Sequence, residues 1–409
     1  MPPRQANRSH KLVVVGAGAW GTAVARNIAI KAKNATNLLT PLHIVVLHHE
    51  EQDNTVTDQI NQQHRNQKFL PNVPLPDTIV ATDDLQAAAH QATLVVFAVP
   101  HEYLHRGIFV KILAGCAPNC RAISLVKGLD VVHHRPELIS HRMSRELMGM
   151  DVSVLSGNNI AAEVAQDEFC EATIGVNEPG AGNIWHSVFN SEKFRVNISN
   201  DPVGVELCGA LKNIVSLGAG FCDGLQLGQN AKASIIRIGL EEMRRFSRLY
   251  FTKVRSATFM EACGVADVIA SSYGGRTRKC AEAFARHHLQ RSSSSNATSK
   301  TWAQLEEELL DGQKLPGMHR LQAVMQCLKH TDPSTQAKFP LFNAIYAVAF
   351  RGANPEEIVN LPERVSWRYK SKPWPLVSAL SFEVKTVIVF GLLALPFLVS
   401  AAASAVTSR

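Results

Sequence analysis

A glycine-rich turn near the N-terminus has the spacing of a phosphate cradle. The turn is GAGAWG, with Gly16, Gly18 and Gly21; it follows an apolar β-branched run and opens a segment with the spacing of a packed helix. In that context Gly16 permits the tight turn, Gly18 lets the backbone approach a pyrophosphate, and Gly21 allows the helix to pack closely on the strand. The helix N-terminus also offers free N–H groups and the positive end of its dipole to phosphates. The sequence context of the turn therefore favours a dinucleotide-binding site over the alternative, a glycine-rich βα turn that binds no ligand.

A second apolar run ends at HHEE, where Glu50 could accept a hydrogen bond from a ribose 2′-hydroxyl and repel a 2′-phosphate. This arrangement favours NAD over NADP. The same acidic pair could also be a solvated surface.

A lysine and an asparagine interrupt an apolar helical pattern in the second half of the chain. Lys212 and Asn213 lie in GALKNIVSLGAGFCDGL. A lysine in this setting either extends its ammonium to solvent or is buried with a lowered pKa. The adjacent asparagine and the glycines that follow favour a functional role. Hydride transfer between a nicotinamide and an alcohol needs a group that takes the hydroxyl proton, and Lys212 is the candidate.

Three further charged residues have positions that suit a ligand site. Lys127 closes an apolar strand at its carboxyl end, the edge where open α/β sheets bind ligands. Asp267 lies in an apolar stretch that leads to a glycine pair and then to Arg276. An arginine beside exposed backbone donors can bind a phosphate through two hydrogen bonds, although a solvated basic turn has the same sequence pattern.

The elements that must position these residues are strands first and helices later. Apolar runs at 12–15, 42–47, up to Pro100 and up to Gly128 are typical of a parallel sheet covered on both faces, and two more short strands extend it to about Val176. After about Asp201 the apolar residues recur at helical spacing. The fold class predicted is α/β: an N-terminal Rossmann-type doubly wound sheet over residues 1–200, followed by a mostly α-helical domain over 201–360. A polar, serine-rich stretch near 290–301 predicts a flexible insertion in the second domain.

Composition sets the outer limits. The 409 residues suit two domains, and the 46% hydrophobic and 19% charged content is typical of a globular protein. The formal net charge is +7 without a run of like charges, so we expect an anionic small molecule as the partner and no nucleic acid. The eight cysteines show no paired spacing, which predicts no metal site and a cytosol-like compartment. We expect no secretory signal before the first strand.

The last segment, residues 361–409, has a different character. A basic stretch with tryptophans leads to an uncharged apolar run at 386–406, long enough to cross a bilayer as a helix of about 20 residues. We expect a C-terminal tail anchor with the rest of the chain facing the cytosol. An apolar helix packed on the protein or in a dimer interface is the alternative.

Taken together, these segments resemble the NAD-dependent glycerol-3-phosphate dehydrogenases, particularly the eukaryotic cytosolic type. The matching strings occur in family order over about residues 11–360, among them GAGAWGTAVA, FAVPHEYL, SLVKGLD, SGNNIAAEVA, ELCGALKNIVSLGAGFCDGL, EACGVADVIASSYGGRTRKCAEAFAR, LLDGQKLPG and KFPLFNAIYAV. The resemblance implies reversible oxidation of sn-glycerol 3-phosphate to dihydroxyacetone phosphate with NAD, in a homodimer.

The resemblance also implies roles for individual residues. Lys212 matches the general acid/base, and Lys127 and Asp267 match its supporting polar residues. The substrate-binding positions are Lys127, Asn159, Asn213, Ser271, Arg276 and Thr277. The cofactor-binding positions are Gly16, Gly18, Ala19, Trp20, Gly21, His49, Tyr103, Ala161, Arg276 and Lys314.

Two departures from the animal members bear on the site: Thr277 replaces an asparagine and Pro316 replaces a glutamine that contacts the cofactor. Two other hypotheses remain open from the residues alone. One is a different two-domain hydroxyacid dehydrogenase, and the other is a non-catalytic, membrane-tethered NAD(H) sensor. The combination of Lys127, Lys212, Asp267 and Arg276 argues against the sensor, which has no need of all four.

Overall fold

The computed structural model describes residues 10–32, 41–46, 54–293, 300–310 and 314–362. The segment expected to be a tail anchor (386–406) and the predicted cofactor residue His49 lie outside these residues. The described chain up to Leu361 belongs to one compact unit.

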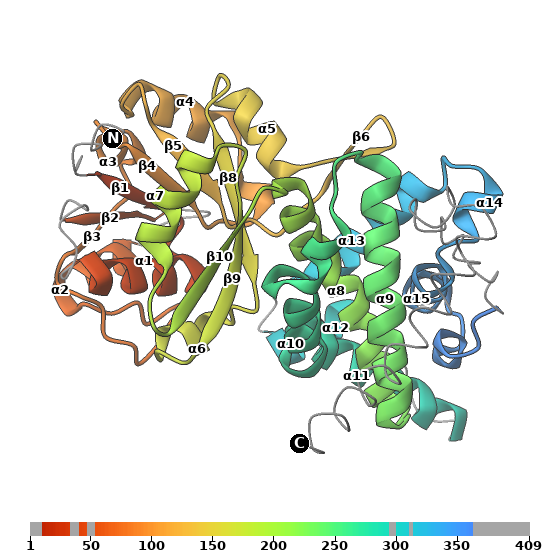
Figure 1. The fold of residues 1–409 in the computed structure, drawn as a ribbon. Coiled ribbons are helices and arrows are strands. Elements are labelled where there is room, and N and C mark those ends of the chain that lie inside the picture. Colours follow the sequence, from red (N-terminus) through yellow and green to blue (C-terminus); the bar gives the residue numbers. More distant parts are fainter. Residues whose placement is uncertain (1–9, 33–40, 47–53, 294–299, 311–313, 363–409) are drawn as a thin grey trace, which may run out of the picture. The chain divides into compact units, whose positions relative to one another are not determined.

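An eight-stranded sheet forms the first half of this unit (Figure 1). Its spatial order is β10-β9-β8-β5-β4-β1-β2-β3. The strand bounds are β1 (Leu12–Val15), β2 (Leu42–Val45), β3 (Ile79–Thr82), β4 (Leu94–Phe97), β5 (Arg121–Ser124), β8 (Val152–Gly157), β9 (Cys170–Gly175) and β10 (Phe194–Ser199). All neighbouring pairs are parallel except β8 and β9. A separate antiparallel hairpin joins β6 (Asp130–Val132) to β7 (Arg135–Glu137).

Helices cover both faces of the sheet, as continuous apolar strands require. Alternate residues of β1 separate into two cores: Leu12 and Val14 face one cluster, and Val13 and Val15 face the other. The first cluster includes residues of α1 (Ala19–Ala32), α2 (Asn54–Gln63), α6 (Ala161–Ala165) and α7 (Pro179–Phe189). The second includes residues of α3 (Leu85–Ala89), α4 (Arg106–Gly115) and α5 (Ile139–Glu146).

The second half is helical and is built around α8 (Pro202–Gly224), whose residues are almost all buried. Asp201 caps its first turn by accepting from the Gly204 N–H at 2.8 Å. Of the described helices, α8 alone is long and apolar enough to cross a membrane, and its burial identifies it as a core helix. Around it lie α9 (Gln229–Tyr250), the 3-10 helix η2 (Ser256–Met260), the π-helix η3 (Ala262–Ala266), α10 (Asp267–Gly274), α11 (Arg276–Ser293), α12 (Trp302–Leu310), α13 (Pro316–Leu328), α14 (Pro333–Gln336), α15 (Pro340–Arg351) and the 3-10 helix η4 (Pro355–Ile358).

The fold confirms the predicted α/β class and the strands expected from apolar runs. Strands β3 and β10 were not expected, because both are partly exposed and lack a continuous apolar run. The pattern also did not indicate that β9 runs antiparallel to β8. Helix α11 continues to Ser293, into the range expected to be an insertion, and residues 294–299 lie outside the described chain.

The GAGAWG turn connects β1 to α1, and its outer glycines are sterically required. Gly16 has a φ of +111°, and a Cβ there would lie 2.4 Å from the Val99 side chain. A Cβ at Gly21 would lie 1.9 Å from the Gly16 carbonyl oxygen, a backbone atom that cannot move aside. A Cβ at Gly18, in contrast, meets no atom of the described chain within 4 Å. Gly16 and Gly21 therefore shape the turn, while Gly18 leaves its outer surface open.

This difference predicts opposite effects of two alanine substitutions on stability. Gly21→Ala should lower the free energy of unfolding by about 1–3 kcal/mol, because the added methyl group forces helix and strand apart. Gly18→Ala is the matched control in the same turn. Its free energy of unfolding should lie within about 0.5 kcal/mol of the wild-type value. Urea unfolding followed by circular dichroism measures both; equal losses would contradict the packing assigned to Gly21.

Candidate active site

The candidate site lies at the edge of the sheet where the carboxyl ends of β1, β4, β5 and β8 meet. These strands are neighbours in the parallel part of the sheet, so the segments that follow them lie at the same edge. They carry the glycine turn after β1, the 3-10 helix η1 (His101–Tyr103) after β4, Lys127 after β5 and Asn159 after β8. The sheet therefore brings together four segments that carry predicted site residues.

A buried carboxylate joins two lysines at this edge. The Lys127 ammonium donates to Asp267 Oδ2 at 2.9 Å, and the Lys212 ammonium donates to Asp267 Oδ1. Lys127 also donates to the Gly157 carbonyl at 3.0 Å. The side chains are 25% exposed for Lys127, 12% for Lys212 and 2% for Asp267. Two cations and one anion are thus held together largely away from solvent, with Lys127 the most accessible.

The surroundings of Lys212 lower its pKa. The pKa of Lys212 is lowered to about 7: burial is the largest cause, the positive charge of Lys127 acts in the same direction, and the Asp267 carboxylate opposes both effects. Of the two possibilities that the sequence left open for Lys212, the structure shows the buried one. An amine that exchanges a proton near neutral pH is suited to general acid/base chemistry.

Local backbone geometry brings the three charged residues within reach of one another. Helix α8 packs closely on the sheet edge at Gly209, where a Cβ would lie 2.5 Å from Ser156 Oγ and 3.4 Å from Lys127 Cγ. Lys212 follows three residues later on the same helix. Asp267 begins α10 directly after the π-helix η3. Such a wider turn in a helix is frequent at functional sites.

The other predicted substrate residues surround this group or begin the next helix. Ser271 is buried one helical turn after Asp267, and its carbonyl accepts from the Gly275 N–H at 3.1 Å. Arg276 and the buried Thr277 begin α11. Asn213 is partly buried on α8, next to Lys212.

Asn159 presents a polar atom that the described chain does not satisfy. Its amide donates to the Glu171 carbonyl at 2.9 Å, but its Oδ1 is buried with no hydrogen-bond partner in the described part of the chain. A buried acceptor without a partner is costly unless a ligand or water supplies a donor.

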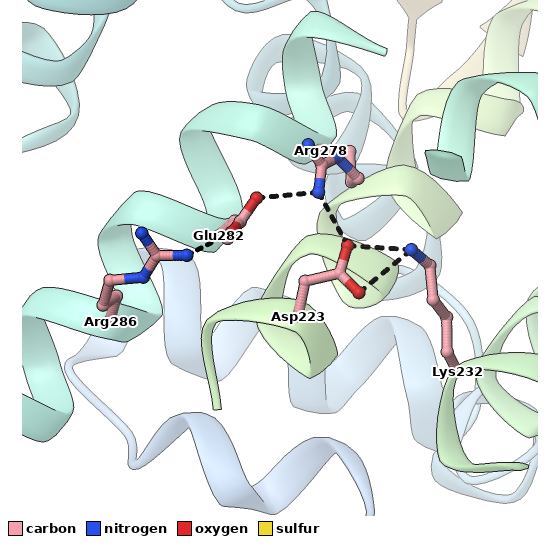
Figure 2. A network of polar contacts seen from close by, with 5 residues as sticks. All are labelled: Asp223, Lys232, Arg278, Glu282 and Arg286. Atoms are coloured by element: carbon pink, nitrogen blue, oxygen red, sulfur yellow. Dashed lines mark hydrogen bonds and ion pairs between the residues drawn. The ribbon is translucent and has the colours of Figure 1, made fainter. Parts of the chain in front are cut away.

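A second ionic network fixes α11 against α8 (Figure 2). Asp223, near the end of α8, accepts from Lys232 of α9 at 2.8 and 2.9 Å and from Arg278 of α11 at 2.9 Å. Arg278 also donates to Glu282 at 2.7 Å, and Glu282 accepts from Arg286. Because Lys212 and Asp223 lie on one helix, and Arg276 lies two residues before Arg278, the network sets the position of Arg276 relative to Lys212.

Close helix packing supports the same alignment. A Cβ at Gly220 would lie 2.4 Å from the Arg278 carbonyl, and one at Gly224 would lie 2.3 Å from the Glu282 carbonyl. Of the glycines that follow Lys212, Gly220 and Gly224 therefore serve the contact between α8 and α11, whereas Gly218 packs against Ile235 and Ile345.

The predicted cofactor residues differ in where their side chains lie. Ala19 and Trp20 begin α1, and the Trp20 ring stacks on Phe194 with centroids 6.5 Å apart, so its side chain belongs to the core and only its backbone suits a phosphate cradle. Tyr103 is exposed in η1 and Ala161 begins α6, both at or after strand ends of this edge. Lys314 is 72% exposed and pairs with Glu306 at 3.0 Å, just before α13.

Sequence reasoning missed two buried charged residues that join the halves. Glu206 of α8 accepts from the Ser140 N–H at 3.0 Å and from its hydroxyl at the start of α5, and burial raises the pKa of Glu206 to about 7. Arg320 of α13 donates to the Lys127 carbonyl. The available signal is a charged residue inside an apolar stretch, the same signal that indicated Lys212 and Asp267.

Among the described residues, no three His, Cys, Asp or Glu side chains are arranged to hold a metal ion. The eight cysteines are all described, and none forms a disulfide.

Comparison with known proteins gives consistent matches along the described chain. Residues 11–181 match the model "NAD-dependent glycerol-3-phosphate dehydrogenase N-terminus", and residues 201–360 match the corresponding C-terminus model. The human "Glycerol-3-phosphate dehydrogenase 1-like protein" is 42% identical over 351 residues, which cover 86% of this chain and 96% of the relative.

Solved structures of the same family also resemble this chain. The glycerol-3-phosphate dehydrogenase of Plasmodium falciparum has a TM-score of 0.79 at 36% identity, covering 88% of this chain and 97% of that one. The glycerol-3-phosphate dehydrogenase of Saccharomyces cerevisiae has a TM-score of 0.77 at 33% identity, covering 87% of this chain and 100% of that one.

Proposed function

The chain belongs to the NAD-dependent glycerol-3-phosphate dehydrogenase family, and we propose that within this family's reaction Lys212 is the general acid/base. The protein is an oxidoreductase that interconverts sn-glycerol 3-phosphate and dihydroxyacetone phosphate with NAD. The observation that carries the proposal is the buried Lys212 ammonium on Asp267, with its pKa lowered to about 7. A side chain of this kind can exchange a proton with the C2 oxygen at physiological pH.

The residues of the glycine turn fit the pyrophosphate of NAD. Gly18 leaves the outer surface of the turn open, and α1 begins at Ala19 directly beside it. The first backbone N–H groups of this helix can donate to phosphate oxygens. Tyr103, Ala161, Lys314 and His49 are proposed as further cofactor contacts. When bound, NAD supplies or accepts the hydride.

The remaining roles follow from the chemistry of each side chain. In the oxidation, neutral Lys212 takes the proton of the C2 hydroxyl, and in the reduction the ammonium returns it. Lys127 donates toward the same oxygen, and Asp267 fixes both lysines. Arg276 binds the substrate phosphate, because a guanidinium can donate two parallel hydrogen bonds to it.

The side chains around this group complete the proposed substrate site. The buried Oδ1 of Asn159 needs a donor, which a substrate hydroxyl can supply. Asn213, Ser271 and Thr277 are proposed to line the substrate. Pro316 stands where the animal members have a glutamine. Its side chain has no hydrogen-bond donor, so it cannot replace the contact of that glutamine with the cofactor.

Compartment and assembly are proposals of their own. We propose a cytoplasmic homodimer, in keeping with relatives named cytoplasmic, such as the rat enzyme at 41% identity over 360 residues. We also propose that the apolar run at 386–406 anchors the chain to a membrane from its cytosolic side.

Removal of the Lys212 amine tests the central proposal. Lys212→Ala should lower kcat for the reduction of dihydroxyacetone phosphate by about 10²- to 10⁴-fold, the usual contribution of a general acid. NADH absorbance measures the rate, and circular dichroism checks the fold. Lys253→Ala, which removes an exposed lysine of the same half, is the matched control and should keep wild-type turnover. Wild-type turnover in Lys212→Ala would refute the assignment.

The lowered pKa predicts opposite pH profiles for the two directions. Oxidation needs neutral Lys212, so its hydride-transfer rate should rise as the pH increases through about 7 and then level off. Reduction needs the ammonium, so its rate should fall over the same range. Stopped-flow measurement of NADH in single turnovers separates this step from product release. Profiles that change in the same direction would exclude Lys212 as the titrating group.

Truncation after Asn360 tests the anchor. The full-length chain should remain with membranes after a carbonate wash, whereas the truncated chain should be released. Equal release of the two would argue against an anchor at 386–406.

A further inference from the structure

Arg320 is a buried cation next to the lysine pair but outside it. It lies on α13, and it is 8% exposed. Its Nη2 donates to the Lys127 carbonyl, and its Nη1 donates to the Pro316 carbonyl at 2.8 Å. Its Nε is buried with no hydrogen-bond partner in the described part of the chain. Burying a guanidinium this completely is costly, so its placement requires a compensating interaction.

The contact with Lys127 joins the two halves at a point where the chain has left the sheet. Strand β5 ends at Ser124, and the next residue is still tied to the neighbouring strand, because the Leu125 N–H donates to the Phe97 carbonyl at 2.9 Å. Two residues later, the carbonyl of Lys127 accepts from Arg320 of the helical half. The main chain of Lys127 is thus held from the side of α13, while its ammonium reaches Asp267 on α10.

A second segment of the sheet edge also faces Arg320. Glu102 follows β4, the strand next to β5, and its carboxylate pairs with His101 at 3.2 Å. The negative charge of Glu102 interacts with the Arg320 guanidinium and opposes the effect of burial, which lowers the pKa of Arg320 to about 10. Arg320 therefore interacts with the segments that follow two adjacent parallel strands.

We propose that Arg320 is a positioning residue: by holding the main chain of Lys127 from α13, it keeps the Lys127 ammonium on Asp267, beside Lys212. This inference rests on the proposed function only for its effect on turnover. The geometric part, the placement of Lys127 beside Lys212, can be tested without substrate or cofactor.

The charge that faces Lys212 provides the signal for that test. Lys127 and Asp267 are the charged groups that act on Lys212, and Lys127 lowers its pKa while Asp267 raises it. If the Lys127 ammonium moves away, its repulsion of the Lys212 ammonium decreases, and the Asp267 carboxylate then interacts with Lys212 alone. The pKa of Lys212 should then rise. Loosened packing that exposes Lys212 would raise the same pKa, because burial is the largest cause of its lowering. The comparison therefore uses only variants whose circular dichroism spectrum and urea midpoint match those of the wild type.

The first experiment measures Lys212 in the protein without ligands. Trace acetylation with acetic anhydride over a range of pH, followed by peptide mass spectrometry, gives the midpoint at which the Lys212 amine becomes reactive. Arg320→Met keeps much of the length and removes every donor, and we expect its midpoint to rise by about one pH unit, the effect of one nearby charge. Arg320→Lys keeps a donor and a charge and should give a smaller rise.

Arg245→Met is the matched control. Arg245, on α9, also donates to a main-chain carbonyl, that of Lys338, and lies outside the proposed site. Its substitution removes the same kind of contact in the same half and should leave the midpoint at the wild-type value. A midpoint in folded Arg320→Met equal to that in Arg245→Met overturns the proposal. If Arg320→Met does not fold, an unchanged midpoint in Arg320→Lys overturns it.

The second experiment measures turnover. Arg320→Met should lower kcat by about 10- to 100-fold, the cost of a misplaced catalytic group, and change the KM for NADH little. Partial recovery of kcat in Arg320→Lys supports positioning, whereas a rise in KM with unchanged kcat contradicts it. Wild-type turnover in Lys212→Ala would refute the proposed general acid/base but would leave the midpoint measurement on Arg320 intact, so the two failures are distinguishable.

Discussion

The site depends on one buried carboxylate, that of Asp267, shared by two ammonium groups. A carboxylate that is 2% exposed is tolerable only if it is paired and hydrogen-bonded, and its two partners come from different halves of the protein. Lys127 follows a strand of the sheet, and Lys212 lies on the central helix α8. The same interaction that joins the halves also sets the proton affinity of Lys212, because the pKa of this amine reflects burial, Asp267 and Lys127 together.

The rest of the fold keeps Lys127, Lys212 and Asp267 in position relative to one another. Packing of α8 on the sheet at Gly209 brings Lys212 to the edge, and the π-helix before α10 presents Asp267 to it. The network around Asp223 then fixes α11, which begins with the proposed phosphate-binding Arg276. Lys232 and Arg278 are largely buried and need Asp223 as a countercharge, so the alignment of α11 is specified by charge as well as by shape.

The sequence was sufficient for features whose causes are local. Strands such as β1 are apolar on both faces, the turn at Gly16 has a fixed spacing, and Lys212 interrupts an apolar helix, so each leaves a signal within a few residues. The direction of β9, the hydrogen bonds from Ser140 to Glu206 and the contact of Arg320 with Lys127 depend on chain segments far apart in sequence. Arg320 and Lys127 are 193 residues apart, and no periodicity or motif within one segment contains that pairing.

The arrangement of charge also suits reaction in both directions. With Lys212 protonated, the group of Lys127, Asp267 and Lys212 carries a formal charge of +1, and with Lys212 neutral it carries none. In the proposed oxidation, Lys212 would gain a positive charge in the same turnover in which bound NAD would lose one on accepting the hydride. The net charge of the pocket would therefore be conserved, and a site largely shielded from solvent need not stabilise a change in total charge. A lysine that exchanges its proton near neutral pH meets this condition, whereas a lysine with its ordinary pKa would remain charged throughout.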